Sequence, residues 1–233
     1  MIKLSSDLSG IKPETVTLMN IFCLKSAFEG SVLEADIWTQ TNDGAVTAVI
    51  ARNSGRLYIH SFSDDYDEIK DFIKVIGYGE VFCDISTARA LDLSVVREFS
   101  VLSVRGDGKI DTYESDISLK ALFERLMLGA DGNIELPDFD SFAPDLSHRL
   151  RHGGAKAFLS ENGAAIVFLC DFGGIVNGIA VSKEKRLCGE GSWLIKSIKD
   201  CTDGELFVCC DEKIKDFYIK NGFFEKGNAV IAR

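Results

Sequence analysis

The chain has 233 residues, 46% of them hydrophobic, with a mean hydropathy of +0.08 and a net charge of −10. A chain of this length can bury a substantial core, as one large domain or two small ones. Its acidity disfavours nucleic acid as a partner, since duplex binding usually requires a basic face, and no apolar run approaches the roughly 20 residues that span a bilayer.

The cysteines favour a reducing compartment. Their number is odd, no two are spaced as Cys-x-x-Cys, and most lie inside apolar runs, at positions 23, 83, 170, 188, 201, 209 and 210. This pattern favours buried, reduced thiols over a disulfide framework or a zinc site. The first residues also lack the long apolar core of a signal peptide. We therefore expect a cytoplasmic protein with no metal and no membrane partner.

The first half of the chain alternates between helical and extended patterns. Pro13 suits the first turn of a helix, and Asn42-Asp-Gly44 is a hairpin signal between two alternating runs. Acidic residues at 64–68 suit the start of a second helix. The expected elements are, in order, a helix at 13–25, strands at 35–40, 45–51 and 56–61, a helix at 64–76 and a strand at 80–85.

The second half repeats this plan after two further helices. Its expected elements are helices at 115–128 and 138–151, strands at 157–160, 164–170 and 175–181, a helix from about 189 and a strand at 205–210. The stretch 129–133 is expected to break the first of these helices. Each half thus holds a hairpin, a third strand, a helix and a strand, although residue identity between the halves is slight. The pattern predicts an α/β chain with two related parts, residues 1–110 and 111–233.

The segment 175–198 carries the most specific chemical signal. An apolar strand pattern leads through a short polar turn to Arg186-x-x-Gly189-x-Gly191 and then to a helical pattern. The free N–H groups and the dipole of a helix start bind anions, and glycines let a phosphate approach the backbone. Arg186 adds a positive charge. We expect a pyrophosphate site, and therefore a nucleotide-bearing cofactor.

This loop resembles the acyl-CoA-binding motif [Arg/Gln]-x-x-Gly-x-[Gly/Ala] of the GNAT superfamily of N-acetyltransferases. A second segment, Asp216-Phe-Tyr-Ile-Lys-Asn-Gly-Phe223, is similar to the helix-to-strand junction that follows later in that superfamily. The other nucleotide motifs fit less well, because a dinucleotide fingerprint needs a third glycine and the chain has no G-x-x-x-x-G-K-[ST]. The resemblance covers residues 138–233 and, more faintly, the first half.

The resemblance implies two GNAT-like halves, each with a mixed, mostly antiparallel central sheet flanked by helices. It also implies that acetyl-CoA is the co-substrate, held by the end of a strand and by the loop after it. Ile179, Ala180 and Val181 would pair through their backbone with the pantetheine arm. The loop residues that would bind the pyrophosphate are Arg186, Leu187, Cys188, Gly189, Glu190, Gly191 and Ser192. Glu190 departs from the pattern, and its carboxylate must point outward. Two interpretations remain for the glycines, a cofactor loop or an ordinary strand-to-helix turn.

Tyr218 is the candidate catalytic residue that the resemblance implies. In GNAT relatives a tyrosine at this position often donates a proton to the departing CoA sulfur, and the alternative is a half-buried tyrosine that only packs its helix. The segment 211–213 lacks the Asn often found after this strand in the family, and no general base is evident.

The first half lacks the glycine loop at the corresponding place. Ser61–Glu68 carries four acids, Asp64, Asp65, Asp67 and Glu68, and no glycine. Carboxylates at a helix start repel a pyrophosphate, so we expect this half to be degenerate, with a structural role and no CoA of its own.

Two other clusters have plainer explanations. His148 and His152 share one face of a helix at i and i+4, but no third metal ligand is evident, and the basic cluster around them suits the end of a helix. A contact to an anionic group of substrate or cofactor is the alternative. Cys209 and Cys210 alternate faces of a strand, and a nucleophilic thiol would need a base that the sequence does not show.

These features predict transfer of an acetyl group from acetyl-CoA to a primary amine of a small molecule or peptide by direct attack. The rival hypothesis is a non-catalytic CoA-binding or interaction protein that keeps the fold and has lost the acceptor chemistry.

Overall fold

The computed structural model describes residues 1–5, 7–28, 35–53, 55–109, 117–130 and 136–233. These residues form two compact units. The first contains Met1–Leu102, Cys209–Asp216 and Glu225–Arg233, and the second contains Ser103–Val208 and Phe217–Phe224. This grouping differs from a single boundary after residue 110, because the last strand, β11 (Phe224–Ala232), pairs antiparallel with β5 (Glu80–Cys83).

The first unit is a mixed, mostly antiparallel sheet with helices packed on it. Its strands follow the order β1-β2-β3-β4-β5-β11-β6, and β4 and β5 run parallel. A core of aliphatic side chains joins the central strands to the helices α2 and α3. The other elements are β1 (Ile2–Leu4), α1 (Val16–Phe28), β2 (Asp36–Asn42), β3 (Ala45–Asn53), β4 (Arg56–Ser61), α2 (Asp67–Ile76), α3 (Ile85–Ala90) and β6 (Val95–Arg105).

The second unit repeats this construction. Its strands follow the order β6-β10-β9-β8-β7, with β9 and β10 parallel and the β7–β8–β9 meander antiparallel. Its elements are α4 (Leu119–Ala130), α5 (Phe139–Arg151), β7 (Ala155–Leu159), β8 (Gly163–Cys170), β9 (Gly173–Val181) and α6 (Glu190–Asp200). It also contains most of β10 (Glu205–Cys210) and the last part of α7 (Glu212–Lys220), whose first part belongs to the first unit. The predicted fold class, two α/β halves with mostly antiparallel sheets, is confirmed.

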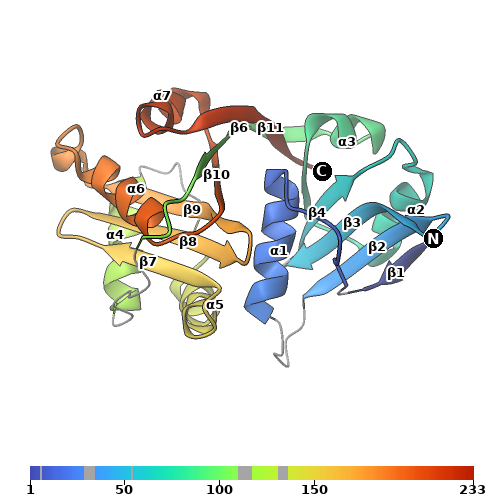
Figure 1. The fold of residues 1–233 in the computed structure, drawn as a ribbon, viewed down its shortest axis with the longest axis horizontal. Coiled ribbons are helices and arrows are strands. Elements are labelled where there is room, and N and C mark those ends of the chain that lie inside the picture. Colours follow the sequence, from blue (N-terminus) through green and yellow to red (C-terminus); the bar gives the residue numbers. More distant parts are fainter. Residues whose placement is uncertain (6, 29–34, 54, 110–116, 131–135) are drawn as a thin grey trace. The chain divides into compact units, whose positions relative to one another are not determined.

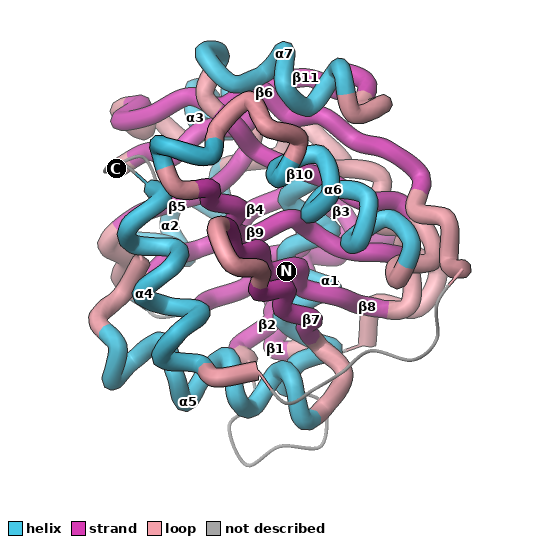
Figure 2. The backbone as a smooth tube through the Cα atoms, turned by 90° about the vertical axis from the view of Figure 1, so that its left-hand side faces the viewer, coloured by secondary structure: helices cyan, strands magenta, loops and turns pink. Residues whose placement is uncertain are grey.

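Helices cover both faces of the β7–β8–β9 meander. Residues alternate between the faces of a strand, so Ile166 and Ala180 pack in one core with α4 and α5, while the Cβ position of Gly163 lies 3.0 Å from Leu194 of α6. Figure 2 shows α4 and α6 on either side of β9. In the described part of the chain, no helix combines the length and the apolar character needed to cross a bilayer.

Most of the predicted elements are confirmed, and the differences are local. The strand expected at 80–85 ends at Cys83, because Asp84 caps α3, a short helix that the sequence did not reveal. The expected break at 129–133 is wrong at its start, since α4 continues through Gly129 to Ala130, and residues 131–133 lie outside the described residues. Strands β1 and β6 were not predicted.

We expect Asp84 to stabilise α3 measurably. Its carboxylate accepts the Thr87 amide at 2.8 Å and the Thr87 hydroxyl at 2.9 Å. Asp84→Ala should lower the free energy of unfolding by about 1–2 kcal/mol in urea denaturation, the usual loss for an N-cap, whereas Asp84→Asn should lose much less. An Ala variant as stable as Asn would contradict the cap.

The same pair should reveal a pH dependence. Burial alone raises the pKa of Asp84, but the hydrogen bonds from Ser86 and Thr87 outweigh burial and lower the pKa below its ordinary value of 3.8. A carboxylate with a lowered pKa stabilises the fold above its ordinary pKa and loses this contribution as the pH falls through the folded value. The stability of the wild type relative to Asp84→Asn should therefore fall in acid, below about pH 4.

Candidate cofactor site

Strand β9 leaves one of its edges open near its end. On one side it pairs with β8 along its whole length, with a register shift that passes over Asn177. On the other side it pairs with β10 only from Gly173 to Ile175. Beyond Ile175 the described residues give this edge of β9 no strand partner. An extended ligand arm can pair with such an edge as a strand does.

The predicted pantetheine-binding residues lie on this open part of β9. Ala180 is buried against α4, where the Cβ position of Gly129 lies 2.7 Å from the Ala180 Cβ. Ile179 and Val181 are half-buried. Ala180 thus fixes this part of the strand in the core, while the backbone edge beyond Ile175 has no strand partner among the described residues.

The loop after β9 contains two residues with left-handed backbones. Leu187 and Gly189 both have left-handed backbones, with φ of 64° and 90°. Successive N–H groups in turns of alternating handedness form a concave anion-binding nest, and the first turn of α6 adds further N–H groups. Among the described residues, the amides from Leu187 to Ser192 have no hydrogen-bond acceptor. This amide cradle, residues 187–192, is suited to a pyrophosphate.

The backbone of the loop is strained at Leu187. A leucine in the left-handed region costs roughly 1–2 kcal/mol, and this side chain is fully exposed, so its own packing does not offset the cost. Arg186 supplies part of the compensation, because its guanidinium donates to the carbonyl oxygens of Val181 at 3.2 Å and of Gly129 at 2.8 Å. Arg186 therefore ties the loop to β9 and α4. Its contact with a phosphate stays a prediction.

The two loop glycines have different surroundings. A Cβ at Gly189 would meet nothing within 4 Å, so the space beside the cradle is open there. A Cβ at Gly191 would lie 3.1 Å from the ring of Phe217, so this glycine lets α6 approach α7 closely. A substitution at Gly191 would therefore disturb packing as well as a ligand, and Gly189 is the cleaner position for a test.

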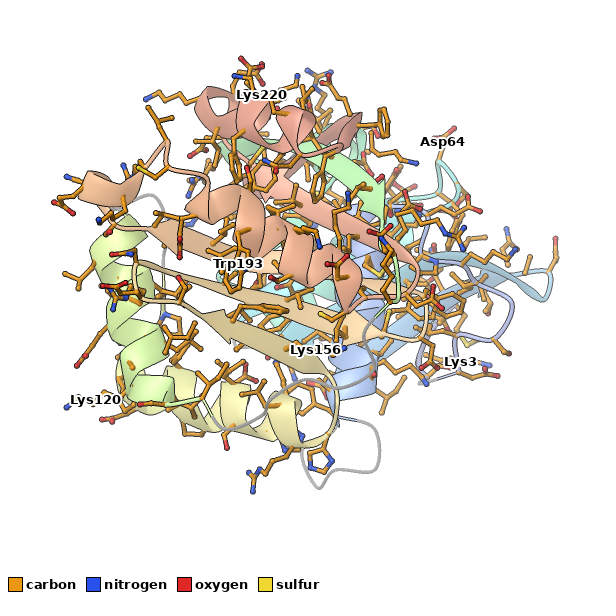
Figure 3. All side chains as sticks on the ribbon, turned by 60° about the vertical axis from the view of Figure 1, so that its left-hand side comes forward. Lys3, Asp64, Lys120, Lys156, Trp193 and Lys220 are labelled. Atoms are coloured by element: carbon orange, nitrogen blue, oxygen red, sulfur yellow. The ribbon has the colours of Figure 1, made fainter. Side chains whose placement is uncertain are left out.

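Glu190 and Trp193 occupy the first turn of α6. The Glu190 carboxylate accepts a hydrogen bond from Ser160, in the turn between β7 and β8. Trp193 is about half exposed, and Figure 3 shows it on α6. The sequence pattern did not single out Ser160, Gly129 or Phe217. The hairpin signal at 161–163 adjoins Ser160, the motif at 216–223 contains Phe217, and the expected break at 129–133 begins at Gly129, but none of these patterns indicated a contact with the loop.

Solved structures of GCN5-related N-acetyltransferases share this architecture. The protein from Kribbella flavida is 12% identical, with a TM-score of 0.59, and the match covers 96% of each chain. That from Sphaerobacter thermophilus is also 12% identical, with a TM-score of 0.55, and the match covers 100% of this chain and 94% of that one. For a putative acetyltransferase from Pyrococcus horikoshii, the values are 11%, 0.51, 100% and 88%. No family model and no curated protein sequence matches the chain.

The chain has the GNAT fold. At these identities the likeness shows the fold, and the chemistry of the site has to be argued from the residues of this chain.

Tyr218, the catalytic residue that the GNAT pattern implies, lies in a packed aromatic cluster. It is 3% exposed, and its ring meets those of Phe217 and Phe223 edge-on at centroid distances of 5.0 and 5.4 Å. The helix that carries it ends at Lys220, just before Gly222, whose φ is 89°. The motif therefore forms the expected helix-to-strand junction. Proton donation by Tyr218 stays a prediction.

The first unit has acids where the second has the amide cradle. Between β4 and α2, Asp64 and Asp65 precede the helix, and Asp67 and Glu68 lie in its first turn. The Glu68 carboxylate is already used, because it accepts the Ile2 amide at 2.8 Å. An anion at this helix start would meet carboxylates. That this half binds no CoA of its own stays a prediction.

The histidine pair lies on one side of α5, near the end of the helix. The rings of His148 and His152 lie 4.4 Å apart on α5, as the i, i+4 spacing predicts. Between them, Arg149 is buried, ion-paired with Asp145 at 2.9 Å and stacked over Phe168. No group of three or more His, Cys, Asp or Glu side chains within the described ranges is arranged to hold a metal ion.

The adjacent cysteines on β10 are poor nucleophiles. Burial raises the pKa of Cys209 to about 12 and that of Cys210 to about 11. Both thiols are therefore protonated at neutral pH, and the thiolate is the reactive form.

The first unit has a hollow of about 320 Å³ whose lining carboxylates are paired with neighbouring side chains. It is lined by Glu98, Phe99, Ser100, Glu212, Glu225 and Asn228. Its carboxylates have partners: Ser100 donates to Glu212, Lys215 pairs with Glu225, and Asn228 donates to Glu98. We assign no ligand to it.

Proposed function

We propose that this chain is an acyl-CoA-dependent N-acyltransferase that moves an acetyl group from acetyl-CoA to a primary amine. The observation that carries the proposal is the amide cradle of residues 187–192, which follows the open edge of β9 after a short turn at 182–186. The cradle suits the pyrophosphate of CoA, and the open edge suits the amides of its pantetheine arm. The GNAT fold supports the same assignment.

The chemistry we propose needs no metal. The amine nitrogen attacks the thioester carbonyl, the C–N bond forms, and the C–S bond breaks. The amine proton leaves to solvent or to a base, the CoA sulfur takes a proton from the Tyr218 hydroxyl, and the tyrosinate regains a proton from solvent before the next turnover. Catalysis then depends mainly on holding amine and thioester together, with the hydroxyl stabilising the leaving thiolate.

The setting we propose follows from charge and from the thiols. With a net charge of −10, the chain suits a cationic amine, on a small molecule or a peptide, better than nucleic acid. Buried thiols such as Cys83, whose pKa burial raises to about 12, suit a reducing cytoplasm.

One observation favours the rival function, a CoA-binding protein without catalysis. Tyr218 is almost fully buried among aromatic rings, which is also what a purely structural tyrosine would show. Both functions require CoA to bind at the cradle, and only the first includes transfer of the acetyl group.

The test combines binding and turnover on the full chain. Calorimetric titration with acetyl-CoA should give one site per chain, and S-acetylpantetheine, which lacks the pyrophosphate, should bind much more weakly. An amine panel with thiol release as the readout should then show turnover. Absent acetyl-CoA binding would refute the proposal. Binding without turnover on any amine would favour the rival, and two sites per chain would show that the first unit also binds CoA.

A further inference from the structure

Glu190 places a negative charge inside a site built for anions. It is the first residue of α6, and its own amide belongs to the cradle. A carboxylate is attracted to a helix N-terminus for the same reason that a phosphate is, through the free N–H groups and the dipole. The flexible Glu190 side chain is therefore a competitor for the cradle, and a repulsive neighbour to any phosphate bound there.

Ser160 binds the Glu190 carboxylate at the β7–β8 turn. Its hydroxyl donates to the Glu190 carboxylate and accepts the Gly163 amide at 2.9 Å. The hydroxyl also lies 3.1 Å from the Gly163 carbonyl oxygen, but a charged acceptor makes the stronger bond. The Ser160 amide donates to the same carbonyl at 2.9 Å, so the turn that carries the hydroxyl is itself fixed.

The side of Glu190 that faces the turn is packed. The Cβ position of Gly163 lies 3.4 Å from the Glu190 Cγ and 3.0 Å from a methyl group of Leu194, one turn further along α6. The stem of Glu190 thus runs over the β7–β8 turn, and its head meets Ser160. Both contacts draw the carboxylate onto the hairpin.

We propose that Ser160 is a positioning residue of the cofactor site, which keeps the Glu190 carboxylate on the β7–β8 turn and so leaves the amide cradle open to the pyrophosphate. This inference rests on the proposed function, because it concerns the same cradle. It adds a residue from a different element, and it predicts a specific coupling between two side chains.

The test is a double-mutant cycle on acetyl-CoA affinity, measured by calorimetry. Ser160→Ala frees the carboxylate and should raise Kd by about 5–20-fold, an ordinary coupling for groups in contact. Glu190→Gln removes the charge and should lower Kd by about 2–5-fold. The double variant should bind about as tightly as Glu190→Gln alone, because without the charge the hydroxyl has nothing to restrain. Ser160→Thr keeps the hydroxyl and should rescue binding.

Two further readouts separate positioning from mere structure. The loss in Ser160→Ala should shrink as salt is raised, since it is electrostatic, and binding of S-acetylpantetheine should not change. If Ser160→Ala weakens binding equally in the wild type and in the Glu190→Gln variant, the inference is overturned while the proposed function stays intact. No loss at all in Ser160→Ala would have the same meaning. A wild-type chain that binds no acetyl-CoA would overturn both.

Discussion

Replacing Gly189 by aspartate should weaken acetyl-CoA binding roughly 10–100-fold, whereas replacing it by asparagine should weaken it less than about 5-fold. The two side chains have the same shape, and both tolerate the left-handed backbone that Gly189 adopts better than other residues do. The open space beside Gly189 accommodates either. The two variants differ only in charge. A hydrogen bond to a charged group contributes about 1.5–3 kcal/mol, and losing one in the aspartate variant corresponds to the expected difference between the two dissociation constants.

The measurement is a calorimetric titration of both variants, with thermal unfolding as the control for folding. The aspartate variant should be at least as heat-stable as the asparagine variant, because a carboxylate at a helix start stabilises the helix. Weaker binding with equal or higher stability is the expected combination. Equal affinities in the two variants would show that no anion binds at the cradle.

Replacing Tyr218 by phenylalanine should lower kcat by roughly 10²–10⁴-fold, the usual span for a positioned acid. The dissociation constant of acetyl-CoA should change by less than about 2-fold, because the thioester sulfur of the ground state is a poor hydrogen-bond acceptor, and the interaction is made mainly in the transition state. Single-turnover rates with a reactive amine, measured where chemistry is limiting, would show the effect.

Tyr66→Phe is a matched control for the loss of a hydroxyl. Tyr66 lies in the first unit, where its hydroxyl is 3.4 Å from that of Thr87, and we expect its removal to leave turnover unchanged. If Tyr218→Phe keeps more than about half of the wild-type rate, Tyr218 is a packing residue, as its aromatic surroundings also allow. The assignment of the cradle to CoA does not depend on this result.

The sequence predicted the elements with strong local signals. The turn signal Asn42-Asp-Gly44 marked the β2–β3 hairpin, and Glu161-Asn-Gly163 marked the β7–β8 hairpin. Helix α5 was expected at 138–151 and begins directly after Asp138, whose carboxylate accepts the Ser141 amide at 2.9 Å. In each case residues close in the chain fix the backbone, so a pattern could reveal them.

The missed strands depend on partners far away in the chain. The first part of β6 is half or fully exposed and carries Arg97 and Glu98, so it lacks the apolar alternation of a strand. Its neighbours in the sheet are β11 and β10, which lie far beyond it in the sequence. Pairing with strands so distant in the sequence cannot be predicted from the residues of β6 alone.

The candidate site also combines features that the sequence could predict with features that it could not. The glycine pattern indicated where the cradle lies, because glycine is what a left-handed turn requires. The left-handed backbone of Leu187 could not be predicted, since leucine rarely adopts it. Nor could the bond from Arg186 to the Gly129 carbonyl or that from Ser160 to Glu190, because both join separate elements through the fold.

The discontinuous make-up of the first unit has a consequence for how the chain acquires its structure. Strand β5 finds its neighbour β11 only near the end of this sequence, where Val230 lies opposite Cys83. During synthesis, the segment that contains β1 to β5 emerges from the ribosome with this side of β5 unpaired, and exposed strand edges of this kind are prone to aggregate. A fragment that stops at residue 110 would keep that edge permanently. Strand β11 thus completes a sheet whose first five strands come much earlier in the chain, and we expect this unit to reach its native state only after β11 has been translated.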